Sequence, residues 1–188
     1  MVYVFISYAA PDESYVSQLY DSLKRLQNIE PIVAEWISAP GMNLVEKVKE
    51  DLKQSKCVVA LITSNSHKEI WPNQEIGFAT AKNLLIIPIK EEAVSMRGFL
   101  EGIEYIKFDP HNFLYNVSDV IDRLVLEYGL RNFFAVCPKC KNKNLRSLSD
   151  RDATRYDEQS ITCDCDKCDV PFTVHSVNLI EDVEYGMA

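Results

Sequence analysis

Short apolar runs alternate with stretches of helical period over the first 130 residues of the chain. Five of these runs are rich in β-branched and aromatic residues, which predicts strands. The runs are residues 2–7, 31–34, 57–63, 84–89 and 104–108. Because they are apolar instead of alternating with polar residues, they predict a parallel sheet that helices cover on both faces.

The stretches between these runs carry apolar residues at helical spacing. Three of them predict helices with one buried stripe, namely residues 15–26, 44–52 and 117–128. Asn43 precedes the second of these helices and fits an N-cap. Pro72 fits the first turn of a further helix, where a missing backbone N–H is tolerated. Residues 91–102 have weak periodicity and predict a short irregular helix and a loop.

The composition is that of one ordinary globular domain followed by a smaller one. The chain has 188 residues, of which 47% are hydrophobic and 26% are charged, a balance that is typical of folded soluble chains. Gly129 and Asn132 mark the end of the last predicted helix. We therefore expect a first domain over residues 1–132 and a second domain with a C-terminal tail over residues 133–188.

The net charge of −8 argues against partners that need a basic surface. Residues 1–133 carry 13 Lys and Arg against 18 Asp and Glu, and residues 134–188 carry 7 against 10. Neither part has the basic footprint that a phosphate backbone requires, so nucleic acid is not expected as a partner. No apolar run reaches the roughly 18 residues that cross a bilayer, and no basic stretch precedes the apolar N-terminal residues. We expect a cytoplasmic protein that does not bind membranes.

The cysteines predict a metal site in the second domain. Five of the six fall within 32 residues, whereas Cys57 opens an apolar strand and is expected to be a buried hydrophobic residue. Cys137 and Cys140 form one Cys-x-x-Cys pair, and Cys165 and Cys168 form another after 24 intervening residues. In a chain without an export signal, such pairs favour a metal over disulfides. Four thiolates make a closed tetrahedral zinc site, which is structural because no position is left for water.

The residues around the second pair predict a small β lobe. Residues 160–162 and 172–177 are typical of strands, and together with the cysteine pairs they resemble a zinc ribbon. Cys163 is an alternative ligand to Cys165 if the turn is set differently, and His175 fits a strand better than a metal site. Zinc ribbons often dock other proteins, so a protein partner of the lobe is a further expectation.

Trp71 and Glu75 are the first candidate site residues of the α/β part. Their spacing of four places an aromatic ring and a carboxylate one turn apart on the same face of a helix. This helix follows the central predicted strand, and open α/β sheets bind ligands at the carboxyl ends of their strands. Taken alone, such a pair is more typical of a core ring beside a solvated acid.

The order and spacing of several motifs resemble those of the TIR (Toll/interleukin-1 receptor) domain family. The motifs are the stretch 4–8 followed by Asp12, Pro40-Gly41 before Leu44, the stretch 58–64, and Trp71 with Glu75. The resemblance covers about 130 residues. It implies a flavodoxin-like fold, in which helices cover both faces of a five-stranded parallel sheet.

The resemblance also implies an activity. Some TIR domains cleave NAD+ at the bond between nicotinamide and ribose, as hydrolases or cyclases in defence signalling, and their catalytic glutamate matches Glu75. In such a site Trp71 would pack beneath the glutamate, and Ser7 and Tyr8 would line the opposite wall. Trp36 would stack on the substrate or, as an equal alternative, simply pack. An ordinary exposed glutamate would suffice, because it is ionised at neutral pH.

Two other functions fit the same resemblance. Some TIR domains are adaptors without catalysis that self-associate through the loop matching residues 35–43, and catalytic relatives complete their pocket by assembling. The fold also resembles that of nucleoside deoxyribosyltransferases, which use a glutamate on glycosidic bonds. The chain has Ala9 and Ala10 where several NAD-cleaving relatives have charged or large polar residues. His67 and Lys68 are candidates for the missing phosphate contact, although solvated side chains are the simpler interpretation.

Overall fold

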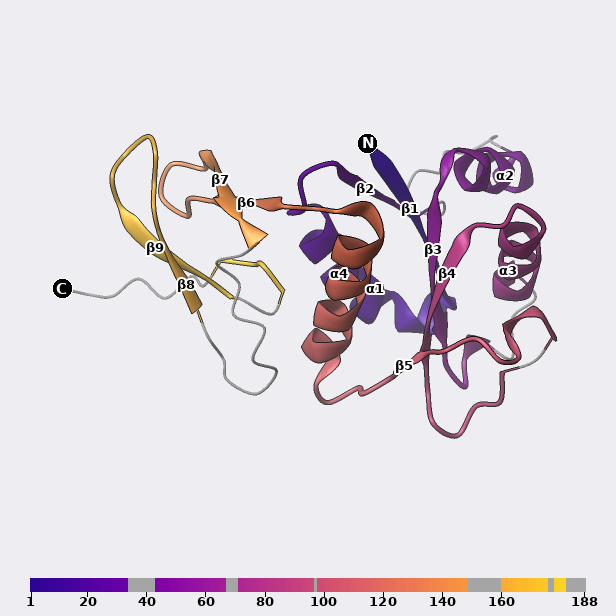
Figure 1. The fold of residues 1–188 in the computed structure, drawn as a ribbon. Coiled ribbons are helices and arrows are strands. Elements are labelled where there is room, and N and C mark those ends of the chain that lie inside the picture. The colour runs from indigo at the N-terminus through magenta and orange to yellow at the C-terminus, as the bar shows by residue number, and fades with distance from the viewer. Residues whose placement is uncertain (34–42, 67–70, 97, 149–159, 176–177, 182–188) are drawn as a thin grey trace.

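The structure is a computed structural model of the 188-residue chain. It describes residues 1–33, 43–66, 71–96, 98–148, 160–175 and 178–181. These residues form an α/β domain and, next to it, a small lobe of β-strands (Figure 1).

A parallel sheet of five strands forms the centre of the α/β domain, as the apolar runs predict. Its strands are β1 (Val2–Ser7), β2 (Ile29–Ile32), β3 (Cys57–Ile62), β4 (Leu85–Lys90) and β5 (Ile106–Lys107). They lie in the order β2-β1-β3-β4-β5. The middle strand, β3, pairs with β1 and β4 and is buried at every position, which explains why its sequence is apolar throughout.

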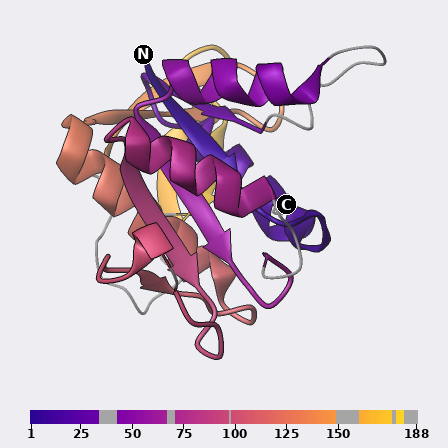
Figure 2. The same cartoon turned by 90° about the vertical axis from the view of Figure 1, so that its right-hand side faces the viewer.

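Helices cover both faces of the sheet. They are α1 (Glu13–Leu23) and α4 (Phe113–Tyr128) on one face, and α2 (Leu44–Gln54) and α3 (Trp71–Ala81) on the other (Figure 1). Figure 2 shows α2 and α3 side by side in front of the strands. Two short 3-10 helices, η1 (Ala10–Asp12) and η4 (Gly98–Leu100), lie in connecting segments. Within the described residues, no helix combines the length and the apolar character needed to cross a bilayer.

The alternation of side chains along the strands divides the core into two layers. Val4 and Ile6 pack in the layer that contains α1 and α4, whereas Phe5 between them packs in the layer of α2 and α3. The same period of two separates Val58 from Val59 on β3. The side chain that follows Ile6 on β1 therefore faces the layer of α2 and α3.

Several predicted elements differ in their bounds from the observed ones. Strand β2 (Ile29–Ile32) begins and ends two residues before the predicted run 31–34, and α1 (Glu13–Leu23) ends three residues before residue 26. Helix α4 begins four residues earlier than predicted, at Phe113, because the ring of Phe113 packs against Tyr15 with 4.9 Å between the ring centroids. Strand β5 is shorter than predicted. The side chain of Asn116 donates a hydrogen bond to the Lys107 carbonyl at 2.8 Å, which uses the backbone group at the end of the strand.

The lobe after α4 consists of two antiparallel hairpins. The first pairs β6 (Asn132–Val136) with β7 (Lys143–Ser147), and the second pairs β8 (Ser160–Asp164) with β9 (Pro171–His175). The second hairpin lies where the sequence predicts two strands. The first was not predicted, because β7 has a single apolar residue, Leu145, and so shows no apolar alternation. The lobe lies beside α1 and α4 (Figure 1) and shares their apolar core through Phe133, Phe172 and Val174.

Candidate functional site

The sheet reverses its strand order between β1 and β3, and the main candidate residues meet at this point. The chain runs outward through β2 on one side and through β4 and β5 on the other. Open α/β sheets bind ligands at the carboxyl ends of the strands beside such a switch point. Ser7 ends β1 at this edge, and Glu75 lies on α3, the helix that follows β3.

Glu75 and Ser7 contact each other directly. The Ser7 hydroxyl donates a hydrogen bond to Glu75 Oε2, and the two oxygens are 2.5 Å apart. Both side chains are buried, with Glu75 4% exposed and Ser7 1% exposed. An ordinary exposed glutamate would suffice for the expected chemistry, whereas the structure buries Glu75. Glu75 lies one turn before Ala79, which packs against the sheet, so the carboxylate belongs to the inward stripe of α3.

A second buried carboxylate ties together the segments around the switch point. Asp12 follows β1 and is 3% exposed. Its two oxygens accept hydrogen bonds from Thr63 Oγ1 at 2.6 Å and from Asn65 Nδ2 at 2.8 Å. Thr63 directly follows β3, so Asp12 fixes the loop after β3 to the segment after β1. The sequence motif contains Asp12, but this bridging role was not predicted because it depends on which strands are neighbours.

The other predicted substrate residues have different placements. Tyr8 is buried in the core layer of α1 and α4, across the sheet from the layer that Ser7 faces. Trp71 begins α3, but its side chain is outside the described part of the structure. Most of the assembly loop 35–43 is also outside it. Three more candidates lie there too, and their roles stay predictions: Trp36, His67 and Lys68.

Lys90 is a feature of the same sheet edge that was not predicted. It ends β4 and is 7% exposed although it carries a charge. Its Nζ donates to the Val94 carbonyl at 2.8 Å and lies 4.6 Å from the ring centroid of Tyr105. Lys90, Met96 and Tyr105 line an open cleft beside the edge of the sheet. The lysine therefore fixes the loop after β4, and the available signal was a cation at the end of an apolar strand.

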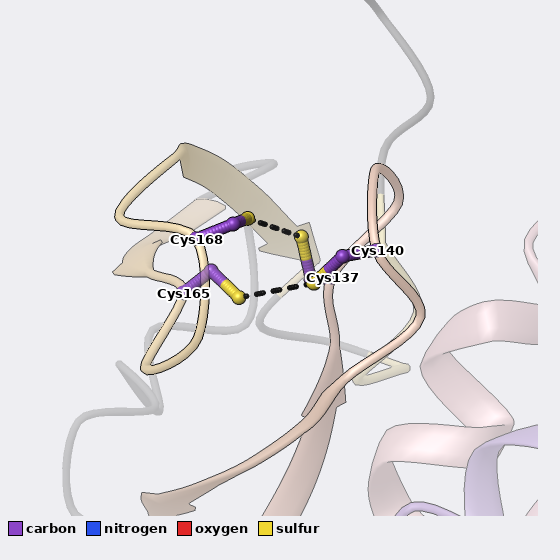
Figure 3. A group of neighbouring side chains, drawn as sticks. All are labelled: Cys137, Cys140, Cys165 and Cys168. Atoms are coloured by element: carbon purple, nitrogen blue, oxygen red, sulfur yellow. Dashed lines mark hydrogen bonds between the residues drawn. The ribbon is translucent and has the colours of Figure 1, made fainter.

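Four cysteines form the second candidate site (Figure 3). Their sulfurs all lie within 4.8 Å of one another. The distance is 3.8 Å between Cys137 and Cys168 and 3.5 Å between Cys140 and Cys165. Tetrahedral zinc with Zn–S bonds of about 2.3 Å requires sulfurs about 3.8 Å apart, whereas a disulfide requires about 2.05 Å. The four thiols therefore fit a metal such as zinc.

Both Cys-x-x-Cys turns have the same backbone geometry. In each, the N–H of the first cysteine donates to the carbonyl five residues later, and the N–H four residues later donates back to that cysteine's carbonyl. The residue after the second cysteine, Lys141 or Asp169, has a positive φ of 59° or 53°. Burial would raise the pKa of Cys165, but N–H groups of Lys167 and Cys168 donate to its sulfur and lower its pKa to about 6. The Val170 N–H would lower the pKa of Cys168, but burial and the neighbouring thiols raise that pKa to about 12. Cys165 is therefore the thiol of this pair that ionises first, and a thiolate is the form that binds metal.

Asn144 joins the two turns behind the sulfurs. It is completely buried, its Nδ2 donates to the Ala135 carbonyl at 3.1 Å, and its Oδ1 accepts from Asp166 N at 2.9 Å. Cys163 lies on β8 and is not part of the four-sulfur group, so the structure brings Cys165 to the other three cysteines. His175 lies on β9, at the position that the sequence predicts for a strand residue.

Comparison with known proteins gives a family match for the α/β domain. Residues 4–125 match the family model of the TIR domain. This range begins within β1, contains β2 to β5 and most of α4, and ends before the lobe with the four cysteines. No curated protein sequence matches the chain significantly.

Solved structures resemble the chain at low sequence identity. The TIR domain of the Toll-related receptor TRR-2 from Hydra magnipapillata is 17% identical, with a TM-score of 0.52, and the alignment covers 66% of this chain and 98% of that domain. A prokaryotic SEFIR domain is 17% identical, with a TM-score of 0.49 and coverage of 68% and 100%. A 2-desoxiribosyltransferase from Leishmania mexicana is 15% identical, with a TM-score of 0.44 and coverage of 62% and 97%. At such identities the first likeness shows the fold alone.

Proposed function

The chain belongs to the TIR domain family, and on this basis we propose that it is an enzyme that cleaves the bond between nicotinamide and ribose in NAD+. The observation that carries the proposal is the buried carboxylate of Glu75, which Ser7 holds at the switch point of the sheet. A carboxylate in this position is costly to bury. A family member that served only as an adaptor would have no need of it.

In the proposed reaction, the bond from the ribose carbon to the pyridinium nitrogen breaks, and both electrons pass to the nitrogen. Nicotinamide then leaves as a neutral molecule, so no general acid is required. Positive charge develops on the ribose carbon, and the carboxylate of Glu75 stabilises it and holds the ribose hydroxyls. Water adds to this carbon and loses a proton to give ADP-ribose, or a nucleophile of the same molecule adds to give a cyclic product.

For the lobe, we propose that Cys137, Cys140, Cys165 and Cys168 hold one structural zinc ion. The spacing of the sulfurs and the matched turns support this assignment. The proposed division is a TIR domain over residues 1–132 and a zinc ribbon over residues 133–188. We place the protein in the cytoplasm, where thiols stay reduced, with self-association through TIR domains and a protein partner for the ribbon.

The direct test is incubation of the purified protein with NAD+, followed by chromatography of the products. We expect free nicotinamide together with ADP-ribose or its cyclic form. NAD+ that stays intact while the protein assembles would leave the adaptor function as the better explanation. Consumption of nucleosides instead of NAD+ would indicate a glycosyl transferase.

Ser7→Ala is expected to lower kcat for NAD+ cleavage by about 10- to 100-fold, because a hydrogen bond to a charged group contributes about 1.5–3 kcal/mol. Without the Ser7 hydroxyl, the carboxylate of Glu75 loses a hydrogen-bond donor that orients it. Steady-state kinetics provide the measurement. Ser22→Ala is the matched control, since this buried serine donates only to the Gln18 carbonyl on α1. Equal kcat values for the two variants would show that Glu75 needs no positioning by Ser7.

A further inference from the structure

The carboxylate of Glu181 connects the lobe to the TIR domain. Its Oε2 accepts a hydrogen bond from the Arg25 guanidinium at 2.7 Å, and its Oε1 accepts one from the backbone N–H of Val136 on β6. The side chain of Glu181 is 9% exposed and that of Arg25 is 23% exposed. Charge-assisted contacts that are shielded from water in this way are stronger than those on an open surface.

Strand β6 also pairs with the turn between α1 and β2. Gln27 N donates to the Asn132 carbonyl at 2.9 Å, and Phe134 N donates to the Arg25 carbonyl at 2.6 Å. Between these bonds, Leu26 and Phe133 form an antiparallel bridge, and both side chains are buried in the shared core. Strand β6, the first strand of the lobe, is thus joined to the TIR domain by backbone hydrogen bonds.

Both parts of the lobe that contact the α1–β2 turn, strand β6 and Glu181, are linked to the segments that carry the cysteine pairs. Strand β6 leads directly into Cys137. Glu181 forms an antiparallel bridge with Val174 on β9, the strand that follows Cys168. The two hairpins belong to separate sheets. Besides apolar packing and the four thiols, polar contacts join them. The Asp166 N–H donates to Asn144, and the Arg146 guanidinium donates to the Asp164 carbonyl on β8 and to the Asp166 carboxylate.

From these contacts we infer that the metal of the four-cysteine site controls how tightly the lobe clamps the α1–β2 turn, and that Glu181 transmits this effect. The inference rests on the proposed zinc site and goes beyond it. With metal bound, β9 is fixed relative to β6, so Glu181 is held where it can bind Arg25 and Val136 together. Without metal, the second hairpin loses this anchor, Glu181 moves away, and Arg25 loses its carboxylate partner.

Thermodynamic linkage makes the coupling reciprocal. If metal tightens the clamp, the clamp must raise metal affinity by the same factor. A coupling between two sites typically corresponds to about 5- to 150-fold in affinity. Glu181 is not a member of the four-sulfur group, so an effect of its substitution on zinc affinity reports the clamp and not the ligand shell.

The test measures the zinc affinity and the zinc content of the full-length chain by competition with a chromophoric chelator. Glu181→Gln and Arg25→Gln are each expected to weaken zinc binding by about five-fold or more. The double variant should bind zinc no more weakly than the weaker-binding single variant, because both substitutions break the same contact. Hydrogen exchange of the amides of Gln27 and Phe134 should accelerate in the zinc-loaded single variants.

Matched controls come from the same corner of the TIR domain. Lys24 and Glu30 form an ion pair that is 37% exposed on both sides, so Lys24→Gln and Glu30→Gln change the same charges without touching the lobe. These controls should bind zinc as the unmodified chain does. If all four single variants bind zinc with the unmodified affinity, the clamp is refuted while the zinc site stands. If the unmodified chain binds no zinc, the zinc proposal itself fails, and the clamp fails with it.

Discussion

Glu75→Gln is expected to abolish NAD+ cleavage while the fold stays intact. Glutamine has the shape of glutamate and keeps an oxygen that can accept the hydrogen bond from Ser7. The variant lacks the negative charge that stabilises the cation forming on the ribose carbon. Loss of one preorganised electrostatic group lowers kcat by roughly 100- to 1,000-fold. The measurement is the rate of nicotinamide release at saturating NAD+, compared with the unmodified chain at equal concentration.

The control for this experiment is Glu91→Gln. The Glu91 carboxylate lies at the same edge of the sheet, where it accepts a hydrogen bond from Ser64 N at 2.7 Å. The control should keep most of the activity, since it removes an equal charge from the neighbourhood without removing Glu75. Both variants are assayed at a series of protein concentrations, and gel filtration determines the oligomeric state at each concentration. A change in self-association is thereby separated from a change in the rate of bond cleavage. Undiminished cleavage by Glu75→Gln would remove Glu75 from the site.

The sheet was predictable from the sequence because its inner strands are buried on both faces. A run such as β3 has no polar position, so its boundaries appear directly in the amino-acid pattern. The N-cap of α2 was also predictable, because capping involves only neighbouring residues. The observed cap is a hydrogen bond that Asn43 Oδ1 accepts from Val45 N at 3.1 Å. The end of β5 was not, because it depends on Asn116, which arrives from the following helix.

In the candidate sites too, features that depend on neighbouring residues were predictable, and contacts between residues far apart in the chain were not. The cysteine turns were predictable because each is a short motif with its own geometry. Ser7 and Glu75 were both predicted as site residues. Their direct contact was not, since 68 residues separate them and the strand order brings them together. The clamp formed by Arg25 and Glu181 has no local pattern at all, because its partners come from opposite ends of the chain.

Replacing Cys137 and Cys140 together by serine is expected to remove the metal and unfold the lobe. Four thiolates hold about one zinc per chain, and elemental analysis of the double variant should find none. Structural zinc contributes an apparent binding free energy of about 10–16 kcal/mol in zinc-finger peptides. Two isolated two-stranded hairpins are marginal without such a contribution. Hydrogen exchange over β8 and β9 should therefore lose its protection, whereas β3 and β4 of the TIR sheet stay protected.

Cys163→Ser is the matched control for the cysteine experiment. Cys163 is buried, as Cys137 and Cys165 are, and lies on β8, but its sulfur is not part of the four-sulfur group. Its replacement should keep about one zinc per chain, because a bystander thiol supplies no bond to the metal. Loss of zinc in Cys163→Ser would place this residue in the ligand shell instead. A double variant that lacks metal yet keeps β8 and β9 protected would show that apolar packing and the polar contacts of Asn144 and Arg146 hold the lobe together, and zinc would then have no structural role.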